Sequence, residues 1–115
     1  MQTERNVLND CLISLSKAGC TVWRNNTGVL KDATGRPIRF GLCNGSSDII
    51  GMCSDGVFLA VECKTAKGRA SPDQERFMSR VRARGGRAGI ARCAADALTI
   101  AVAPVQQRLE QKPPR

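Results

Sequence analysis

Three charged residues around a predicted β-hairpin, Asp48, Glu62 and Lys64, are the groups in this sequence best suited to chemistry. Side chains alternate along a strand, so Glu62 and Lys64 face the same side of the strand predicted at 57–64. A tight turn at 54–56, which contains an Asp-Gly pair, places Asp48 opposite Glu62. Opposed carboxylates about 4.5–5.5 Å apart at Cβ repel each other unless a cation lies between them. The spacing therefore predicts a carboxylate pair beside a lysine.

A hard divalent cation suits such a pair. Mg²⁺ takes oxygen ligands and commonly binds one or two carboxylates together with substrate phosphate. The backbone carbonyl of Cys63 could supply a third oxygen, and Lys64 would bring positive charge to an attacking water and a phosphate. This arrangement would hydrolyse a phosphodiester without a histidine. The alternative interpretation is that Glu62 and Lys64 are only the polar end of a strand.

Two further residues, Gln74 and Glu4, allow a functional and a structural interpretation. Gln74 precedes Phe77 by three residues on a predicted helix and so faces the sheet, but it also completes a capping box with Ser71. Glu4 lies at the edge of the apolar face of the first predicted helix. It either joins the carboxylates or favours the helix dipole as a first-turn acid. Both alternatives stay open for each residue.

Composition narrows the class of partner and of catalysis. The chain has 115 residues and a net charge of +8, so it predicts one small domain at 1–104, a flexible tail at 105–115 and a polyanionic partner. Nucleic acid comes first among these partners and an acidic membrane surface second. The absence of histidine excludes Ser-His-Asp and Cys-His catalysis and every histidine-containing metal site. Four aromatic residues are too few for a base-stacking platform.

The cysteines and the apolar runs bear on the compartment. The six cysteines form no C-x-x-C pair and no signal peptide is recognisable, so we interpret them as reduced, buried hydrophobes of a cytoplasmic protein. The longest apolar runs are too short to span a bilayer. We therefore expect no membrane association.

The pattern of elements predicts a mixed α/β fold around one small sheet. The second helix joins two strands, which a single crossover should make parallel and adjacent. Its Phe77, Met78 and Val81 are expected to form a buried stripe. The predicted elements are a helix at 3–18, a strand at 20–24, a loose hairpin at 29–31 and 37–40, strands at 48–53 and 57–64, a helix at 72–84, a strand at 87–92 and a helix at 94–103.

Basic residues gather after the predicted carboxylate strand. Between 62 and 92 there are nine Lys or Arg, and Arg76 and Arg80 follow the four-residue spacing of one helix face. Lys67 and Arg69 lie in the loop that follows Lys64. A run of charge is usually a solvated face, but the arginine bias near the carboxylates favours phosphate contacts.

The ordered motifs at 45–51, 58–65 and 68–77 resemble the VRR-NUC nucleases of the PD-(D/E)xK superfamily. The resemblance also includes Arg24-Asn25-Asn26 and covers nearly the whole chain. It implies a restriction-endonuclease-like core and a Mg²⁺- or Mn²⁺-dependent DNA endonuclease without a small-molecule cofactor. It implies that Asp48 and Glu62 bind metal, that Lys64 positions or activates water, and that Gln74 supports the site. Glu4 matches an acid on the family's first helix, whereas Ser47 stands where a proline is frequent.

The resemblance also implies a substrate and an assembly. Stand-alone members encoded by phages would act as homodimers on four-way DNA junctions, and larger repair members would cut flaps. The leading hypothesis is thus junction resolution by a homodimer, with a flap or general endonuclease, or a catalytically silent nucleic-acid-binding module, as alternatives. An RNA-binding protein would fit the charge but leave the carboxylates unexplained. The candidate DNA-contacting residues are Arg24, Asn25, Lys67, Arg69, Arg76 and Arg80.

Overall fold

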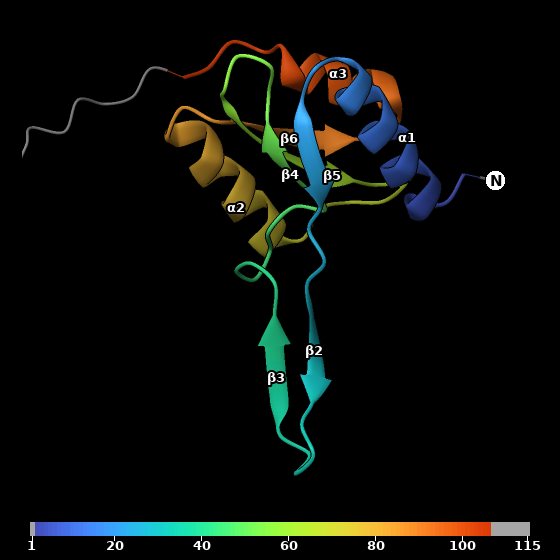
Figure 1. The fold of residues 1–115 in the computed structure, drawn as a ribbon, viewed down its shortest axis with the longest axis vertical. Helices are drawn as coiled ribbons and strands as arrows, with labels where there is room; N and C mark the ends of the chain where they lie inside the picture. The colour runs from blue at the N-terminus through green and yellow to red at the C-terminus, as the bar shows by residue number, and fades with distance from the viewer. Residues whose placement is uncertain (1, 107–115) are drawn as a thin grey trace, which may run out of the picture.

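The computed structural model describes residues 2–106 and has a mixed α/β fold, as the sequence predicts (Figure 1). Four strands form one sheet in the order β1-β4-β5-β6, and β2 and β3 pair separately. Neighbours are antiparallel except β5 and β6, which are parallel as the crossover predicts. The elements are α1 (Glu4–Lys17), β1 (Thr21–Arg24), β2 (Gly28–Lys31), β3 (Pro37–Phe40), β4 (Ile49–Met52), β5 (Phe58–Cys63), α2 (Pro72–Ala83), β6 (Arg87–Ala91) and α3 (Ala94–Ala101).

The central strand β5 is buried on both faces. Its residues Leu59 to Cys63 are all buried, and they read as an almost continuous apolar run. Glu62 interrupts this run and keeps only 2% of its surface exposed. Burial of an acid is costly unless it is paired or neutralised, so this position needs a specific environment.

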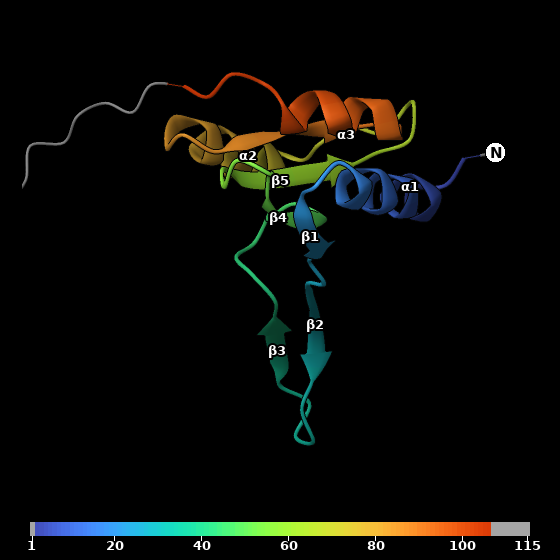
Figure 2. The same ribbon diagram turned by 45° about the horizontal axis from the view of Figure 1, so that its top comes forward.

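Two helical layers hold the sheet (Figures 1 and 2). Helices α1 and α3 pack together over one face, where Val7, Cys11 and Leu15 of α1 meet Ile49 and Leu59 of the sheet. On the other face α2 packs on β5 and β6. Within residues 2–106, α2 makes no comparable contact with β1 or β4.

Strands β2 and β3, with their turn, project from the sheet as an arm, defined here as residues 28–40 (Figures 1 and 2). The carboxylate of Asp32 orders the turn by accepting from the Thr34 amide at 2.8 Å and the Arg36 amide at 2.9 Å. Lys31, Arg36 and Arg39 are exposed, as expected. The loose hairpin predicted at 29–31 and 37–40 is thus confirmed.

The helices differ from the sequence expectations in two places. On α2 only Met78 is buried, whereas Phe77 and Val81 are half-buried because they line an open groove instead of the sheet. Helix α3 ends at Ala101, with Val102 as its C-cap, before the predicted end at 103. No helix within residues 2–106 is long and apolar enough to cross a membrane.

The cysteine prediction is right in part. All six cysteines are free thiols, and Cys11, Cys20, Cys53 and Cys63 are buried. Cys43 and Cys93 are exposed, contrary to expectation. Cys43 lies in the segment between β3 and β4, and Cys93 is the N-cap of α3. Most of the tail predicted at 105–115 lies outside the described residues.

Candidate active site

The register of β4 and β5 brings Asp48 beside Glu62. Ile49 pairs with Val61, so the next pair along the ladder joins the two acids. Hydrogen-bonded and non-hydrogen-bonded pairs alternate in an antiparallel ladder, and Cys53 donates to the Val57 carbonyl at 2.8 Å. Counting from that pair makes Asp48–Glu62 a non-hydrogen-bonded pair, the kind in which side chains approach more closely. The predicted opposition of these residues is confirmed.

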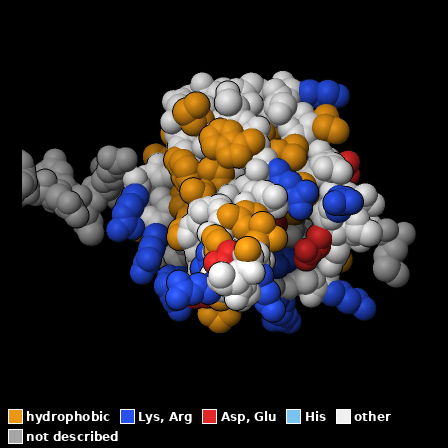
Figure 3. Space-filling view, turned by 60° about the horizontal axis from the view of Figure 1, so that its bottom comes forward, with side chains coloured by type: hydrophobic (Ala, Val, Ile, Leu, Met, Phe, Trp, Pro, Cys, Tyr) orange, Lys and Arg blue, Asp and Glu red, His pale blue; other side chains and the backbone are white. Residues whose placement is uncertain are grey.

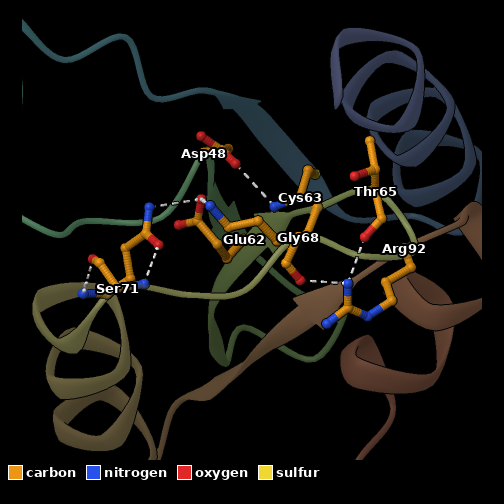
Figure 4. A network of polar contacts seen from close by, with 9 residues as sticks. Asp48, Glu62, Cys63, Thr65, Gly68, Ser71 and Arg92 are labelled. Atoms are coloured by element: carbon orange, nitrogen blue, oxygen red, sulfur yellow. Dashed lines mark hydrogen bonds and ion pairs between the residues drawn. The ribbon is translucent and has the colours of Figure 1, made fainter. Parts of the chain in front are cut away.

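Two hydrogen bonds hold Asp48, one to its carboxylate and one to its backbone carbonyl. Its Oδ2 accepts a hydrogen bond from the backbone amide of Cys63 at 2.9 Å (Figure 4). Its backbone carbonyl accepts from the amide of Asn25 at 2.7 Å, just beyond the end of β1. The carboxylate of Asp48 therefore lies beside the C-terminal end of β5.

Glu62 has one satisfied and one unsatisfied oxygen. Its Oε1 accepts from Gln74 Nε2 at 3.2 Å and lies 4.0 Å from Lys64 Nζ. Its Oε2 is buried and has no hydrogen-bond partner. A buried polar atom without a partner is rare in folded proteins and marks a place where a ligand could bind.

Gln74 contacts both Ser71, in the predicted capping box, and Glu62 on the sheet. Its Oε1 accepts from the Ser71 amide at 2.8 Å, and its own amide donates to Ser71 Oγ at 3.2 Å, which completes the capping box of α2. Its Nε2 remains for Glu62 (Figure 4). The N-terminus of α2 is thereby linked to the carboxylate pair.

The electrostatics of the pair follow from burial and like charge. Burial raises the pKa of Glu62 from 4.5 to about 9, and the neighbouring Asp48 carboxylate acts in the same direction. Lys64 opposes this shift, and Glu4 adds to it. Without a cation, Glu62 is therefore protonated at neutral pH, because two adjacent carboxylates cannot both ionise cheaply in a buried site.

Glu4 lies on the same side of the molecule as the pair. With Arg24 and Asp48 it lines a cavity of about 200 Å³. Within residues 2–106, no group of three or more Cys, Asp and Glu side chains is close enough to hold a metal ion. The structure thus brings together two acids and leaves Glu4 as a neighbour across a small cavity.

The candidate contact residue Asn25 has an internal role. Its Nδ2 donates to Ser46 Oγ at 2.8 Å and to the Ser47 carbonyl at 2.9 Å. These bonds hold the segment that leads into Asp48. Arg24, in contrast, borders the cavity beside that carboxylate.

The loop after Lys64 is held by Arg92, a residue that sequence reasoning did not single out. Arg92 Nη1 donates to the carbonyls of Thr65 and Gly68, at 2.5 and 2.7 Å (Figure 4). Lys67 and Arg69 are exposed on this loop. In the sequence, Arg92 is one of nine similar basic residues, and its backbone acceptors lie 24 to 27 residues away, so no local signal could reveal its role.

The basic surface is smaller than the count of nine suggests. Arg82 donates to the Ala88 carbonyl at 2.9 Å, and Arg87 donates to the Ala103 carbonyl at 2.6 Å, so both hold the fold. Arg76 is exposed but pairs with Asp73 at 3.0 Å. A groove of about 600 Å³ runs beside this side of α2, and its lining includes Arg76, Arg80, Phe58, Phe77 and Val81.

Comparison with known families accounts for this arrangement. The sequence matches the family described as the VRR-NUC domain over residues 3–95, a range that contains the carboxylate pair, Lys64 and Gln74. A search of curated proteins finds no match. The match covers most of the 115 residues, and the chain therefore belongs to the VRR-NUC family of nuclease domains.

Proposed function

We propose that this protein is a metal-dependent DNA endonuclease that cleaves branched DNA, with four-way junctions as its main substrate. Membership of the family implies a nuclease domain that acts on DNA. The observation that carries the proposal is that the half-buried Asp48 lies opposite the buried Glu62, with Lys64 Nζ 4.0 Å from Glu62 Oε1. This arrangement is suited to hydrolysis of a phosphodiester and needs no histidine.

The donor atoms fit a hard divalent cation. Glu62 Oε2 is buried without a partner, and the neighbouring Asp48 raises the pKa of Glu62, so a cation would satisfy both groups. The amide of Cys63 points toward Asp48, and the carbonyl of a strand residue points to the same side as its amide. Asp48, Glu62 and the Cys63 carbonyl would thus hold Mg²⁺ or Mn²⁺. Bound there, the metal would lower the pKa of a water and offset phosphate charge.

The chain's own residues orient the reaction. Lys64 keeps 14% of its side chain exposed, so its ammonium can reach an attacking water or a phosphate oxygen while remaining beside Glu62. Gln74 holds one oxygen of Glu62 by a hydrogen bond and leaves the other for a ligand. Glu4 would contribute through its charge across the adjoining cavity.

Cationic residues flank the pair on two sides. Arg24 borders the cavity next to Asp48, and Lys67 and Arg69 are exposed on the loop that follows Lys64. Phosphate contacts on both sides of the scissile bond would fix the strand and give a strong salt dependence of binding. A four-way junction has two-fold symmetry, so a homodimer would place one active site on each of two equivalent strands.

Cleavage of matched substrates tests the proposal. The full chain is incubated with labelled four-way junction, flap, splayed and linear DNA, in Mg²⁺, in Mn²⁺ and in excess chelator. We expect paired nicks in the junction that require metal. Asp48→Asn and Lys64→Ala should lower the rate at least about 100-fold and retain junction binding, because one removes a metal ligand and the other the cation that stabilises the transition state.

A matched control and two outcomes decide the result. Asp10→Asn changes an exposed acid on the outside of α1 and should cleave like the parent chain. Cleavage that survives chelator or both site variants would overturn the metal mechanism. Equal rates on linear and branched DNA would overturn the preference for branches, and a faster rate on the flap would replace the junction as substrate.

A further inference from the structure

The arm presents an apolar face that has no partner in the described chain. Leu30 pairs with Ile38 across the two strands, and Phe40 lies two residues farther along on the same face. These side chains are 64%, 50% and 38% exposed. An isolated two-stranded hairpin is marginally stable in water, so a projecting arm with an apolar face gains stability when that face is covered.

The sheet presents a second uncovered apolar surface. Trp23, Met52 and Phe58 share one face of the sheet, because Trp23 pairs with Ile50 and Met52 pairs with Phe58. This is the face on which α2 packs, mainly on β5 and β6. The three side chains are 53%, 47% and 42% exposed. We call these three residues the sheet patch. Phe58 also lines the groove beside α2, so the patch continues into that groove.

The two surfaces do not cover each other within one chain, because the side chains of both are 38–64% exposed. Figure 3, seen from the end of the arm, shows hydrophobic side chains gathered around and beside the arm. Both stems of the arm are tied to the sheet: the Asn25 side chain holds Ser46 and Ser47, and its amide holds Asp48. The arm therefore projects away from the sheet of its own chain (Figures 1 and 2).

We propose that two copies of this chain exchange arms, so that Leu30, Ile38 and Phe40 of each copy cover the sheet patch of the other. Both halves of the contact are on one sequence, and a two-fold axis would satisfy both at once. Six large side chains, each about half exposed, present roughly 600 Å² per copy. Each partner in a standard interface buries about 600–1,000 Å², so the exchange suffices for a dimer.

The charges of the arm agree with this orientation. Lys31 and Arg39 lie on the opposite face of the arm from Leu30 and Ile38, because side chains alternate along each strand. Packing of the apolar face against a second copy would leave these cations directed outward, toward solvent or DNA. The interface core would thus be free of arm charges, as is usual for interface centres.

This inference locates the surface of the homodimer that the proposed function invokes, but the measurement of dimerisation needs neither DNA nor metal. Sedimentation velocity of the full chain between about 1 and 100 μM should show a dimer. Leu30→Asp and Ile38→Asp should each weaken the dimer at least about 100-fold, because a carboxylate would be buried in the contact. These side chains are exposed, so the core should melt as in the parent chain.

Val29→Asp is the matched control, since Val29 is 54% exposed on the same strand but on the other face. It should remain a dimer. A parent chain that is monomeric over this range, or arm-face variants that dimerise like the parent, would overturn the proposal whether or not the protein cleaves DNA. Arm-face variants that lose only DNA affinity would assign the arm to DNA and overturn it too.

Disulfide trapping tests which surfaces meet. In a background with the exposed Cys43 and Cys93 changed to serine, one tagged copy carries Leu30→Cys and a differently tagged copy carries Met52→Cys. Mild oxidation should link the two kinds of copy and not two copies of one kind. Efficient crosslinking of Leu30→Cys copies to each other would show arm-to-arm contact and overturn the exchange.

Discussion

The side-chain amide of Gln74 donates to Glu62 Oε1 at 3.2 Å while its oxygen caps α2 through the Ser71 amide at 2.8 Å. One residue thus joins helix capping to the orientation of a buried acid. We expect Gln74→Ala to lower both the melting temperature and the cleavage rate. The rate should fall at least about tenfold, which corresponds to a loss of about 1.4 kcal/mol of transition-state stabilisation.

Ser71→Ala separates these two roles. It removes the hydroxyl that caps α2 and leaves the Gln74–Glu62 contact in place, so it should cost about 1 kcal/mol of stability without a matching loss of cleavage. Thermal melts and single-turnover rates measured on both variants check this. If Ser71→Ala slows cleavage as much as Gln74→Ala, the contact with Glu62 has no role of its own.

The protonation of Glu62 predicts a pH dependence of stability without metal. Its pKa is raised from 4.5 to about 9, so the folded state binds a proton that the unfolded state releases above pH 4.5. The stability that protonation contributes is complete below pH 4.5 and is lost as the pH rises toward 9. Between pH 5 and pH 8 in chelator, the melting temperature should fall by about 5 °C or more.

Glu62→Gln is the control for this titration, because an amide stays neutral over the whole range. Its melting temperature should be nearly constant between pH 5 and pH 8. The lowered pKa values of Asp32 and Asp55 affect stability only below this window, since both groups ionise near or below 3.8. If the melting temperature of Glu62→Gln falls between pH 5 and pH 8 as steeply as that of the parent chain, a group other than Glu62 causes the pH dependence.

Divalent metal should reverse the loss at high pH. At pH 8, Mg²⁺ at ten times its dissociation constant would stabilise the folded chain by about 1.4 kcal/mol. That corresponds to a rise in melting temperature of roughly 4–8 °C for a small domain. Sodium chloride of equal ionic strength is the reference, and Asp48→Asn and Glu62→Gln should show no such rise. A rise preserved in both variants would place the metal elsewhere.

Arg92 is expected to act through the loop after Lys64. Arg92→Ala removes the donor shared by the partly buried Thr65 and Gly68 carbonyls. It should cost about 1 kcal/mol, because the Thr65 carbonyl keeps the Gly68 amide as a donor at 3.1 Å. The freed loop should also weaken junction binding through Lys67 and Arg69. Arg82→Ala is the comparison, since it loses a carbonyl contact at Ala88, away from this loop. Equal effects on binding would mean that only stability has changed.

Alanine substitutions at Gly45 and Gly35 test how tightly the segment that leads to Asp48 is packed. Gly45 lies in that segment, and Gly35, in the turn of the arm, is the control. Both have a positive φ, 83° and 84°, which costs a side chain about 1–2 kcal/mol. A Cβ at Gly45 would lie 2.5 Å from the Asp73 carbonyl oxygen, whereas a Cβ at Gly35 meets nothing within 4 Å. Gly45→Ala should therefore destabilise clearly more than Gly35→Ala in denaturant unfolding. Similar losses would mean that the segment shifts freely.

The carboxylate pair could be predicted because its determinants are local. The period of two along a strand and the length of the turn at 54–56 fix which residue stands opposite Glu62, and β5 was identifiable as central from its apolar run. The capping box of α2 was readable for the same reason. In each case the partners lie within 15 residues, so the sequence itself contains the geometry.

What the sequence could not reveal depends on contacts between distant segments. Arg87 and Arg92 resemble the other cations of the chain, yet they bind backbone carbonyls 16 and 27 residues away that only the folded topology brings near. The openness of the groove beside Phe77 likewise depends on which part of the sheet α2 covers. Helical periodicity identifies an apolar face but not how much of it a small sheet can bury.

The placement of both acids on consecutive strands has a consequence for the order of folding. Asp48 and the Cys63 amide are 15 residues apart, whereas the Cys11 thiol and the Cys93 carbonyl that join α1 to α3 are 82 apart. Closing the shorter loop costs less chain entropy, so we expect the β4–β5 hairpin to consolidate before the terminal helices dock. The two carboxylates would then be opposed before the rest of the core excludes water from them.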